Sequence, residues 1–403
     1  MNRKTTAAAV LAALGVLAAG AAQAQSSVTL YGIVDLGLGY QKIKGQGLEQ
    51  SRTGLIDGVQ SGSRWGLRGS EDLGNGLRAV FQLESGFNPR TGRSLQGERL
   101  FGRQATVGLA GDSWGQLLGG RKTNITSEFF ASIDPFAAAF GQANIGTAFS
   151  AANTVRWDNQ IQYQTPSIGG FQLGVGYSFD INETANAIAV NGNTGAVTDN
   201  FSTNQKNRGI TAGLRYVNGP LNLAASYDQV NRRSGAADAG AGNPFGPTGD
   251  RIRSWMVGGS FDFEVVKLAL AYGQTRDGWF GSPGLQSGQS LPGTVEVGGA
   301  TVNLPTGNYL GTSFREGSKV NSYLVGLTAP LGPGSLFGSW QRADPSNDRL
   351  TGDDATLNVY SLGYTYDLSK RTNLYAYGSY AKNYAFLDDV KSQLVGVGVR
   401  HRF

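Results

Sequence analysis

Cysteine is absent from this chain of 403 residues, and histidine occurs once, as His401. Without cysteine the chain forms no disulfide, has no thiolate nucleophile and offers no sulfur ligand to a metal. One histidine near the chain end also disfavours a zinc site and a histidine-based catalytic site, because a general base needs a positioned partner. The residues therefore predict no enzyme activity, no metal site and no cofactor.

Charged residues and long apolar runs are also scarce. Charged side chains make up 16% of the chain, compared with about 25% in ordinary soluble proteins. After residue 22 no apolar run approaches the length of about 18 residues that a transmembrane helix needs. The formal net charge of +5 is dispersed, without a basic run or helix that could enter a nucleic-acid groove, so a nucleic-acid partner is not expected.

The first 24 residues have the layout of a secretory signal peptide. Arg3 and Lys4 precede an apolar run at residues 7–22, and Ala22-Gln23-Ala24 offers a small-x-small cleavage site. An N-terminal membrane anchor is the alternative, but the run is short and weakly apolar for a span. We therefore expect a signal peptide at residues 1–24 and one mature domain at residues 25–403, since no linker divides the rest.

Glycine is abundant, with 61 residues, and short segments of alternating polarity recur along the mature chain. A period of two is typical of strands with one face against an apolar phase and one against water. Sixteen such segments are expected, at residues 27–42, 63–72, 77–87, 101–111, 114–123, 159–168, 171–179, 207–219, 221–231, 253–263, 266–276, 320–331, 334–344, 355–369, 372–383 and 391–403. The alternation at 101–111 and 114–123 is too poor to predict which way their side chains face.

The connections between these segments alternate between short and long. Short ones are rich in turn residues, such as those around Asn75-Gly76 and Gly332-Pro333. Long ones are expected at residues 43–62, 88–100, 124–158, 180–206, 232–252 and 277–319. This asymmetry is typical of an up-and-down antiparallel barrel in the outer membrane, with short periplasmic turns and long extracellular loops.

The number of strands indicates where water lies. Sixteen strands enclose a lumen too wide for side chains to fill, so the interior is wet and the apolar face meets lipid. We therefore predict an all-β, transmembrane, antiparallel up-and-down barrel. Aromatic residues near the two interfaces are expected to form girdles, and the last hairpins are dense in them: Tyr360, Tyr364, Tyr366, Tyr375, Tyr377, Tyr380, Tyr384 and Phe386.

The chain ends on an alternating strand. Val395, Val397, Val399, His401 and Phe403 share one face. Soluble chains rarely end in this way because termini fray, whereas a membrane barrel must close its last strand onto its first. The end of the chain is therefore interpreted as the seam of the barrel.

Motifs throughout the mature chain resemble the general porins of Gram-negative β-proteobacteria. They occur in the family's order and cover the mature chain. The resemblance implies a sixteen-stranded, trimeric outer-membrane channel whose third long loop folds into the lumen as a constriction. The matching segments are Ser26–Asp35, Ser63–Gly69, Glu71–Leu77, Ala79–Glu84, Phe101–Ala105, Arg156–Tyr163 and Val399–Phe403.

The resemblance also implies a charged constriction. It places Arg64, Arg103 and Arg156 as a basic cluster on the barrel wall at the narrowing. Arg68 and Arg78, which the facing of the strands puts on the lumen side, are expected to belong to the same basic wall of the constriction. Opposite them, Glu128 and Asp134 of the loop at 124–158 are expected to form an acidic side, although this loop is unusually rich in Ala, Phe and Gly. Walls of one charge sign set the ion preference of a pore.

The resulting functional hypothesis is a passive diffusion channel for ions and small hydrophilic solutes, with an anion preference. A substrate-specific channel or a loop-mediated adhesin remains the alternative. Expected partners are two further copies in a homotrimer, outer-membrane lipid and lipopolysaccharide, and the barrel-assembly machinery. By the resemblance, the machinery recognises the closing strand through Phe403, with Val395, Val397 and Val399 behind it.

Overall fold

The computed structural model describes residues 27–182, 206–233, 249–281 and 313–403, together with four short strands within 189–198 and 294–303. The predicted signal peptide at residues 1–24 lies outside the described residues. Within the described part, no helix is long and apolar enough to cross a membrane.

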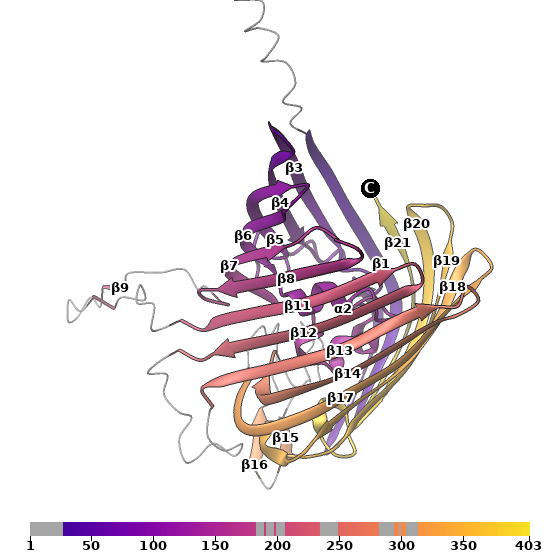
Figure 1. Ribbon diagram of the computed structural model, residues 1–403. Helices are drawn as coiled ribbons and strands as arrows, with labels where there is room; N and C mark the ends of the chain where they lie inside the picture. Colours follow the sequence, from indigo (N-terminus) through magenta and orange to yellow (C-terminus); the bar gives the residue numbers. More distant parts are fainter. Residues whose placement is uncertain are drawn as a thin grey trace, which may run out of the picture.

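The described strands form one closed antiparallel barrel, in which each strand pairs with its neighbours in the chain (Figure 1). The sheet closes because β1 pairs with β21 over Ile33–Lys44 and Lys391–Arg402. Its strands are β1 (Ser27–Gly45), β2 (Leu48–Asp57), β3 (Arg64–Gly74), β4 (Leu77–Gly86), β5 (Gln104–Gly111), β6 (Gly115–Thr123), β7 (Arg156–Gln164), β8 (Phe171–Ser178), β11 (Arg208–Asn218), β12 (Leu221–Asn231), β13 (Arg251–Asp262), β14 (Lys267–Trp279), β17 (Ser313–Leu331), β18 (Gly334–Pro345), β19 (Leu357–Asp367), β20 (Thr372–Lys382) and β21 (Lys391–Arg402).

The remaining elements are short. Outside the barrel wall, β9 (Ala189–Val190) pairs with β10 (Val197–Thr198), and β15 (Thr294–Val297) pairs with β16 (Ala300–Asn303). The one α-helix in the described residues, α2 (Ile125–Phe130), lies inside the barrel (Figure 1). The 3-10 helices are η1 (Gly141–Ala143), η2 (Ile145–Thr147), η3 (Ser150–Ala152), η5 (Asp348–Leu350) and η6 (Tyr384–Phe386).

The prediction of a long loop at residues 43–62 is wrong. β1 continues to Gly45, turns tightly, and returns as β2, which pairs with β1 from Leu48 to Asp57. Residues 64–70 of β3 then pair with the first part of β1. β2 and β3 are therefore two halves of one barrel strand, which keeps the barrel at sixteen strands. The composition of β2 hid this strand, because residues 49–54 carry no apolar side chain that could alternate with the polar ones.

A short inward bend separates β2 from β3 and is held by Asp35 of β1. The Asp35 carboxylate accepts a hydrogen bond from the backbone N–H of Ser61 at 2.7 Å, and the Asp35 backbone N–H donates to Ser63 Oγ at 3.0 Å. Gly58 begins the bend with a φ of 62°, a backbone conformation that favours glycine. The bend places residues 58–62 on the inner wall of the barrel.

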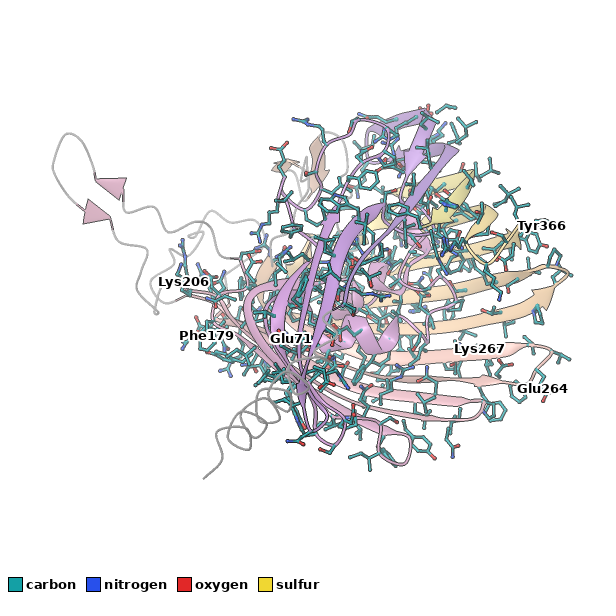
Figure 2. The ribbon with its side chains drawn as sticks, turned by 90° about the horizontal axis from the view of Figure 1, so that it is seen from above. Glu71, Phe179, Lys206, Glu264, Lys267 and Tyr366 are labelled. Carbon is teal, nitrogen blue, oxygen red and sulfur yellow. The ribbon has the colours of Figure 1, made fainter. Side chains whose placement is uncertain are left out.

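The two ends of the barrel differ as predicted. All described turns at one end are short, whereas the opposite end carries the long connections (Figure 1). Figure 2 shows Phe179 and Lys206 at the end with the long loops and Glu264, Lys267 and Tyr366 at the end with the short turns. Most of the predicted loops 180–206, 232–252 and 277–319 lies outside the described residues.

The outer face of the barrel is apolar and the inner face polar. On β5, Val107 is 66% exposed on the outside while Thr106 is 5% exposed inside, which settles the facing that alternation left open. Outward aromatic side chains gather in two bands. The band near the long loops includes Tyr227, Trp255, Tyr272, Tyr323, Trp340, Tyr360 and Tyr380, and the band near the short turns includes Phe171, Tyr216, Phe261, Phe263, Tyr364 and Tyr366.

Four of the aromatics expected in girdles face elsewhere. Tyr375 and Tyr377 point into the barrel, and Tyr384 and Phe386 are buried in a loop. The alternation of β20 puts Tyr375 and Tyr377 on the face opposite to Tyr380. These two inward rings contact the loop inside the lumen, as described below.

The last strand forms the seam as predicted. Val395, Val397 and Val399 are exposed on the outer face and lie opposite Tyr40, Leu38 and Leu36 of β1. The backbone of Phe403 exchanges two hydrogen bonds of 3.1 Å with Gly32. A side chain at position 32 would collide with the Phe403 ring, so glycine makes room for it.

Candidate pore constriction

The connection between β6 and β7, residues 124–155, which the sequence predicted as the third long loop, folds into the lumen and begins with α2. Asn124 caps this helix by accepting a hydrogen bond from the backbone of Ser127. The Asn124 amide and the Thr126 hydroxyl both donate to Asp228 on the inner face of β12. Gly174 and Gly213 on the wall leave room for Ile125, because a Cβ at either position would touch it. These contacts fix the start of the loop against β8, β11 and β12.

An aromatic cluster holds the middle of the loop against the opposite wall. Phe136 packs edge-to-face on Phe337 of β18. Phe140 packs at a tilt on Phe337 and edge-to-face on the inward rings of Tyr375 and Tyr377, and the centroid distances in the cluster are 5.0 to 5.7 Å. Contacts of this kind contribute about 1 kcal/mol each beyond the buried area. The loop therefore crosses the lumen from β12 to β20 and narrows it.

Hydrogen bonds fasten the rest of the loop to inward polar side chains. Gln142 exchanges hydrogen bonds with Ser392 of β21, and the amide of Gln341 donates to the Ala143 carbonyl at 2.6 Å. Ser322 donates to the Ala148 carbonyl at 2.6 Å. The polar inner face that makes the lumen wettable also anchors the loop.

Asp134 organises the tip of the loop and does not face the pore. Its carboxylate is 4% exposed and accepts hydrogen bonds from the backbone N–H groups of Phe136, Ala138 and Ile145, at 2.9 to 3.0 Å. Burial raises the pKa of this carboxyl to about 6, against the opposite influence of the three N–H donors. The prediction of Asp134 as a pore-facing acid is wrong, because the loop uses its carboxylate internally.

Glu128 does not form an acidic side either. It pairs with Lys122 of β6 and accepts hydrogen bonds from Thr123 at 2.9 Å and Gln164 at 2.5 Å. Lys122 was not predicted as a site residue, and it neutralises the carboxylate locally. The expected opposition of loop carboxylates and wall arginines is therefore not what the structure contains.

Three consecutive alanines occupy the place expected for the acids. We call Ala137, Ala138 and Ala139 the alanine lip. Ala137 and Ala138 have φ values of 51° and 55°, a left-handed conformation that costs a non-glycine residue about 1 kcal/mol or more. The hydrogen bond from Ala138 to Asp134 holds this conformation.

The arginines Arg64, Arg103 and Arg156, here called the arginine wall, come together from three places in the chain. Arg64 begins β3, Arg103 immediately precedes β5, and Arg156 begins β7. Glu84 of β4 lies 2.7 Å from Arg103 and 3.9 Å from Arg64. One carboxylate thus serves two guanidinium groups, so the wall keeps a net positive charge.

Arg156 has no ion pair among the described residues. One of its nitrogens donates to the Thr154 carbonyl at 3.1 Å, and its Nε has no hydrogen-bond partner. Its nearest charges are mostly of the same sign, from Arg103, Arg121 and Arg64. A cation among cations in a narrow, partly desolvated site attracts anions strongly.

The arginine wall and the alanine lip line one cavity of about 650 Å³. Arg52 and Arg90, which the sequence placed in loops, also line it, so five arginines surround a single lining carboxylate, Asp57. Arg90 pairs with Asp57 at 2.6 Å. Arg52 was missed because strand β2 was not predicted. Arg90 lies in the connection between β4 and β5, where no signal in the sequence distinguished it from other loop residues.

Arg68 and Arg78 lie on the inner wall but away from this cavity. Arg68 stacks over the Tyr31 ring at 5.4 Å and lines a separate space nearer the short turns. Arg78 pairs with Asp112 at 2.9 Å at the end of β4, six residues from Glu84, which is about 20 Å along a strand. Placing Arg68 and Arg78 in the constriction is therefore wrong. The alternation of a strand shows only that a side chain points into the barrel. How far along the barrel axis it lies depends on the register of the strands.

The described residues contain no group of three histidine or carboxylate side chains positioned to hold a metal. The charged side chains that line the cavity are the five arginines and Asp57, so its chemistry is that of fixed charge around an aqueous path.

Comparisons with known proteins agree with this geometry. The family model of Gram-negative porins matches residues 7–385. An outer membrane porin protein of Bordetella pertussis is 57% identical over 415 aligned residues that cover 100% of both chains, and outer membrane porin protein 32 of Delftia acidovorans is 32% identical over 93% of this chain and 89% of its own.

A solved structure also resembles this barrel. An anion-selective porin from Comamonas acidovorans has a TM-score of 0.65 and 28% identity, covering 94% of this chain and 100% of its own. The fold, the inward loop and these relatives lead to one conclusion: the chain belongs to the family of Gram-negative porins and forms a passive, water-filled channel in the outer membrane.

Proposed function

We propose that the channel prefers anions and that the arginine wall sets this preference. The observation that carries the proposal is the imbalance around the cavity, where five arginines line a space with one lining carboxylate. A solute passing between the wall and the lip meets positive charge on one side and methyl groups on the other. The similarity to the anion-selective porin from Comamonas acidovorans, at 28% identity, supports the same preference for anions over cations.

The test is the ion selectivity of the purified protein in planar bilayers. In a KCl gradient, the reversal potential should have the sign of chloride permeation. A reversal potential at zero or of the opposite sign would contradict the proposal, and an absence of conducting steps would contradict the channel itself.

We also propose that the protein is a homotrimer, that the long loops face the outside, and that no reaction is catalysed. The family resemblance supports the trimer, and conductance should then appear in groups of three steps. Chemical cross-linking of intact cells should give a species of three chains. A dominant monomer in both measurements would contradict the trimer.

The terminal strand is proposed to guide assembly through Phe403. Its exposed ring lies at the end of the seam and stacks over Gly32. Deletion of Phe403 should lower the amount of porin inserted in the outer membrane and leave the conductance of inserted channels unchanged. Equal membrane yield for the truncated and full-length chains would contradict this role.

A further inference from the structure

One side of the lumen is filled near the long loops. The inner wall of a porin is ordinarily polar because it meets water, but here β17 and β19 point apolar side chains inward. These residues are at most 1% exposed: Val320, Leu324, Leu357 and Val359. Among the described residues, the cavity at the arginine wall is lined by none between Arg156 and Tyr377, which leaves out every strand from β8 to β19. We call this part of the lumen the filled side.

The last connection of the barrel, residues 383–390, folds over the filled side. We call it the mouth loop. Its η6 turn packs against β19, and Phe386 lies edge-to-face on Trp279 at the end of β14, with ring centroids 5.2 Å apart. Along the wall, β20 and β14 are separated by β19, β18 and β17, or about 19 Å at the usual strand spacing. The mouth loop therefore reaches Trp279 by crossing the mouth of the barrel.

The mouth loop and the inward loop, residues 124–155, occupy the filled side together. Tyr384, Phe386 and Leu387 of the mouth loop are at most 2% exposed. They belong to one continuous apolar cluster with Ile145 and Phe149 of the inward loop and with the inward side chains of β17 and β19. Two loops from distant parts of the sequence thus exclude water from the same part of the lumen.

The position of the mouth loop is held against backbone strain. Its φ values are 53° to 62° at four residues, Asn383, Ala385, Phe386 and Asp389. The Asn383 side chain accepts a hydrogen bond from the backbone N–H of Asp389 at 3.2 Å and donates to the Thr356 carbonyl at 3.1 Å. Left-handed non-glycine residues persist only where packing and hydrogen bonds over-determine them, so the loop has one defined position over the mouth.

We propose that the mouth loop is a second specificity element of the channel, which closes the filled side so that entering solutes pass Arg52 and Arg90 before they reach the arginine wall. Both residues line the cavity. Arg52 lies opposite Gln41 of β1. Arg64 lies opposite Ile33, which is eight residues, or about 26 Å, farther from the long loops along the same strand. The selectivity part of the proposal rests on the proposed anion preference, whereas the closure of the filled side does not.

The first experiment measures thiol accessibility, because any introduced cysteine is the only one in the chain. Val359→Cys places a thiol on the filled side in a side chain no larger than valine, and Gln41→Cys places one in the cavity. Purified channels in liposomes are treated with an anionic methanethiosulfonate reagent. A buried thiol reacts only when the loops open locally, so Val359→Cys should react at least about a hundredfold more slowly than Gln41→Cys.

Shortening the mouth loop should remove this difference. Deleting residues 384–389 and changing Val390→Gly leaves an Asn-Gly pair between Lys382 and Lys391, which already lie opposite each other. Asn-Gly is a favoured two-residue hairpin turn, and Asn383 already has the positive φ that this turn requires, so the barrel should close normally. The thiol on the filled side should then react at a rate within about tenfold of the thiol in the cavity.

A second variant keeps the full length of the loop. Asparagine tolerates the left-handed backbone, so Phe386→Asn withdraws the ring from Trp279 without new strain. Labelling of the thiol on the filled side should rise about tenfold, because the loop opens more often. Asp389→Asn is the matched control, since Asp389 also has a positive φ in the mouth loop but an exposed side chain. It should leave the labelling rate unchanged.

The second experiment measures the reversal potential of the same proteins in a KCl gradient. With the full loop, Arg52→Gln combined with Arg90→Gln should lower the chloride-to-potassium permeability ratio about threefold, because every ion passes these charges. In the shortened chain ions also enter over the filled side, so the same pair should lower the ratio by less than about 1.5-fold. Arg64→Gln, at the constriction below, should have the same effect at both loop lengths.

Two labelling results would overturn the proposal. Fast reaction of Val359→Cys in the full-length chain would show that water reaches the filled side, and slow reaction that persists after shortening would assign the closure to the inward loop alone. Equal, non-zero effects of the Arg52 and Arg90 substitutions at both loop lengths would also overturn it. No effect at either length would contradict the proposed source of the anion preference, and the labelling rates then decide the closure on their own.

Discussion

The arginine wall and the alanine lip line the same cavity, but they are built in different ways. The wall gathers Arg64, Arg103 and Arg156 from three separate strands or strand ends, and Arg64 and Arg103 share Glu84 as a partner. The lip is three consecutive residues whose backbone is held by one buried carboxylate, Asp134. One side contributes charge, and the other contributes shape.

This difference shows how a pore obtains selectivity from one side only. With acids on the lip, wall and loop would form a transverse field and partly cancel each other's attraction for mobile ions. Because the lip carries only methyl groups, it does not oppose the electric field of the arginine wall. The loop can therefore set the width of the passage while the wall sets the sign of the ions.

The largest expected effect concerns the stability of the lip. Burial raises the pKa of Asp134 from its ordinary 3.8 to about 6, so the folded state holds this proton more tightly than the unfolded state. The contribution to stability is therefore greatest below about pH 4 and is lost as the pH rises to about 6, by up to about 3 kcal/mol.

Asp134→Asn removes the titrating group and should abolish this slope. Thermal unfolding in detergent should show the wild type losing stability relative to the variant as the pH rises from about 4 to about 6. Parallel pH profiles for the two proteins would show that Asp134 does not titrate in this range.

Weakening the wall should have the next largest effect. Arg64→Gln combined with Arg156→Gln should lower the chloride-to-potassium permeability ratio about tenfold, because the narrow site loses two positive charges while Glu84 stays paired with Arg103. The matched control is Arg68→Gln with Arg78→Gln, which removes the same charge from the inner wall outside the cavity. Reversal potentials measure both variants, and equal shifts would mean that the position of the charge is irrelevant.

Charging the lip should have a smaller effect. Ala138→Asp adds the carboxylate that the lip lacks, and aspartate tolerates the left-handed backbone at this position. The anion preference should fall about threefold, since one mobile carboxylate opposes several arginines. Ala138→Asn has nearly the same shape without the charge and should keep the wild-type reversal potential. If Asp and Asn behave alike, the lip acts by shape alone.

Releasing Arg90 should have the smallest effect. Asp57→Asn removes its partner at 2.6 Å and leaves one more unpaired arginine in the cavity. The Arg90 side chain is 34% exposed, so solvent screens its charge. The anion preference should therefore rise by less than about twofold. A fall in the chloride-to-potassium ratio in the same reversal-potential measurement would contradict this sign.

Much of the barrel was predictable because a period of two has one simple cause. Side chains alternate across a strand, so the apolar face of β21, with Val395, Val397 and Val399, was evident before the seam was seen. β2 was missed because residues 49–54 (Glu-Gln-Ser-Arg-Thr-Gly) carry no apolar side chain, so polarity does not alternate along this strand. The inward turn of Tyr375 and Tyr377 was missed because aromatic residues suit a girdle and a packed loop equally well.

The sequence by itself determined the membrane barrel, its sixteen strands, its two unlike ends and the inward face that carries Arg64, because these depend on local alternation and on turn residues. Only the tertiary structure decided how far along the barrel axis each arginine lies, because the register of the strands separates Arg78 from Arg64 on the same inner wall. It also decided that Asp134 supports the loop instead of facing the pore. A carboxylate serves the backbone or the solvent according to which N–H groups surround it, and those donors come from residues brought together only by the folded loop.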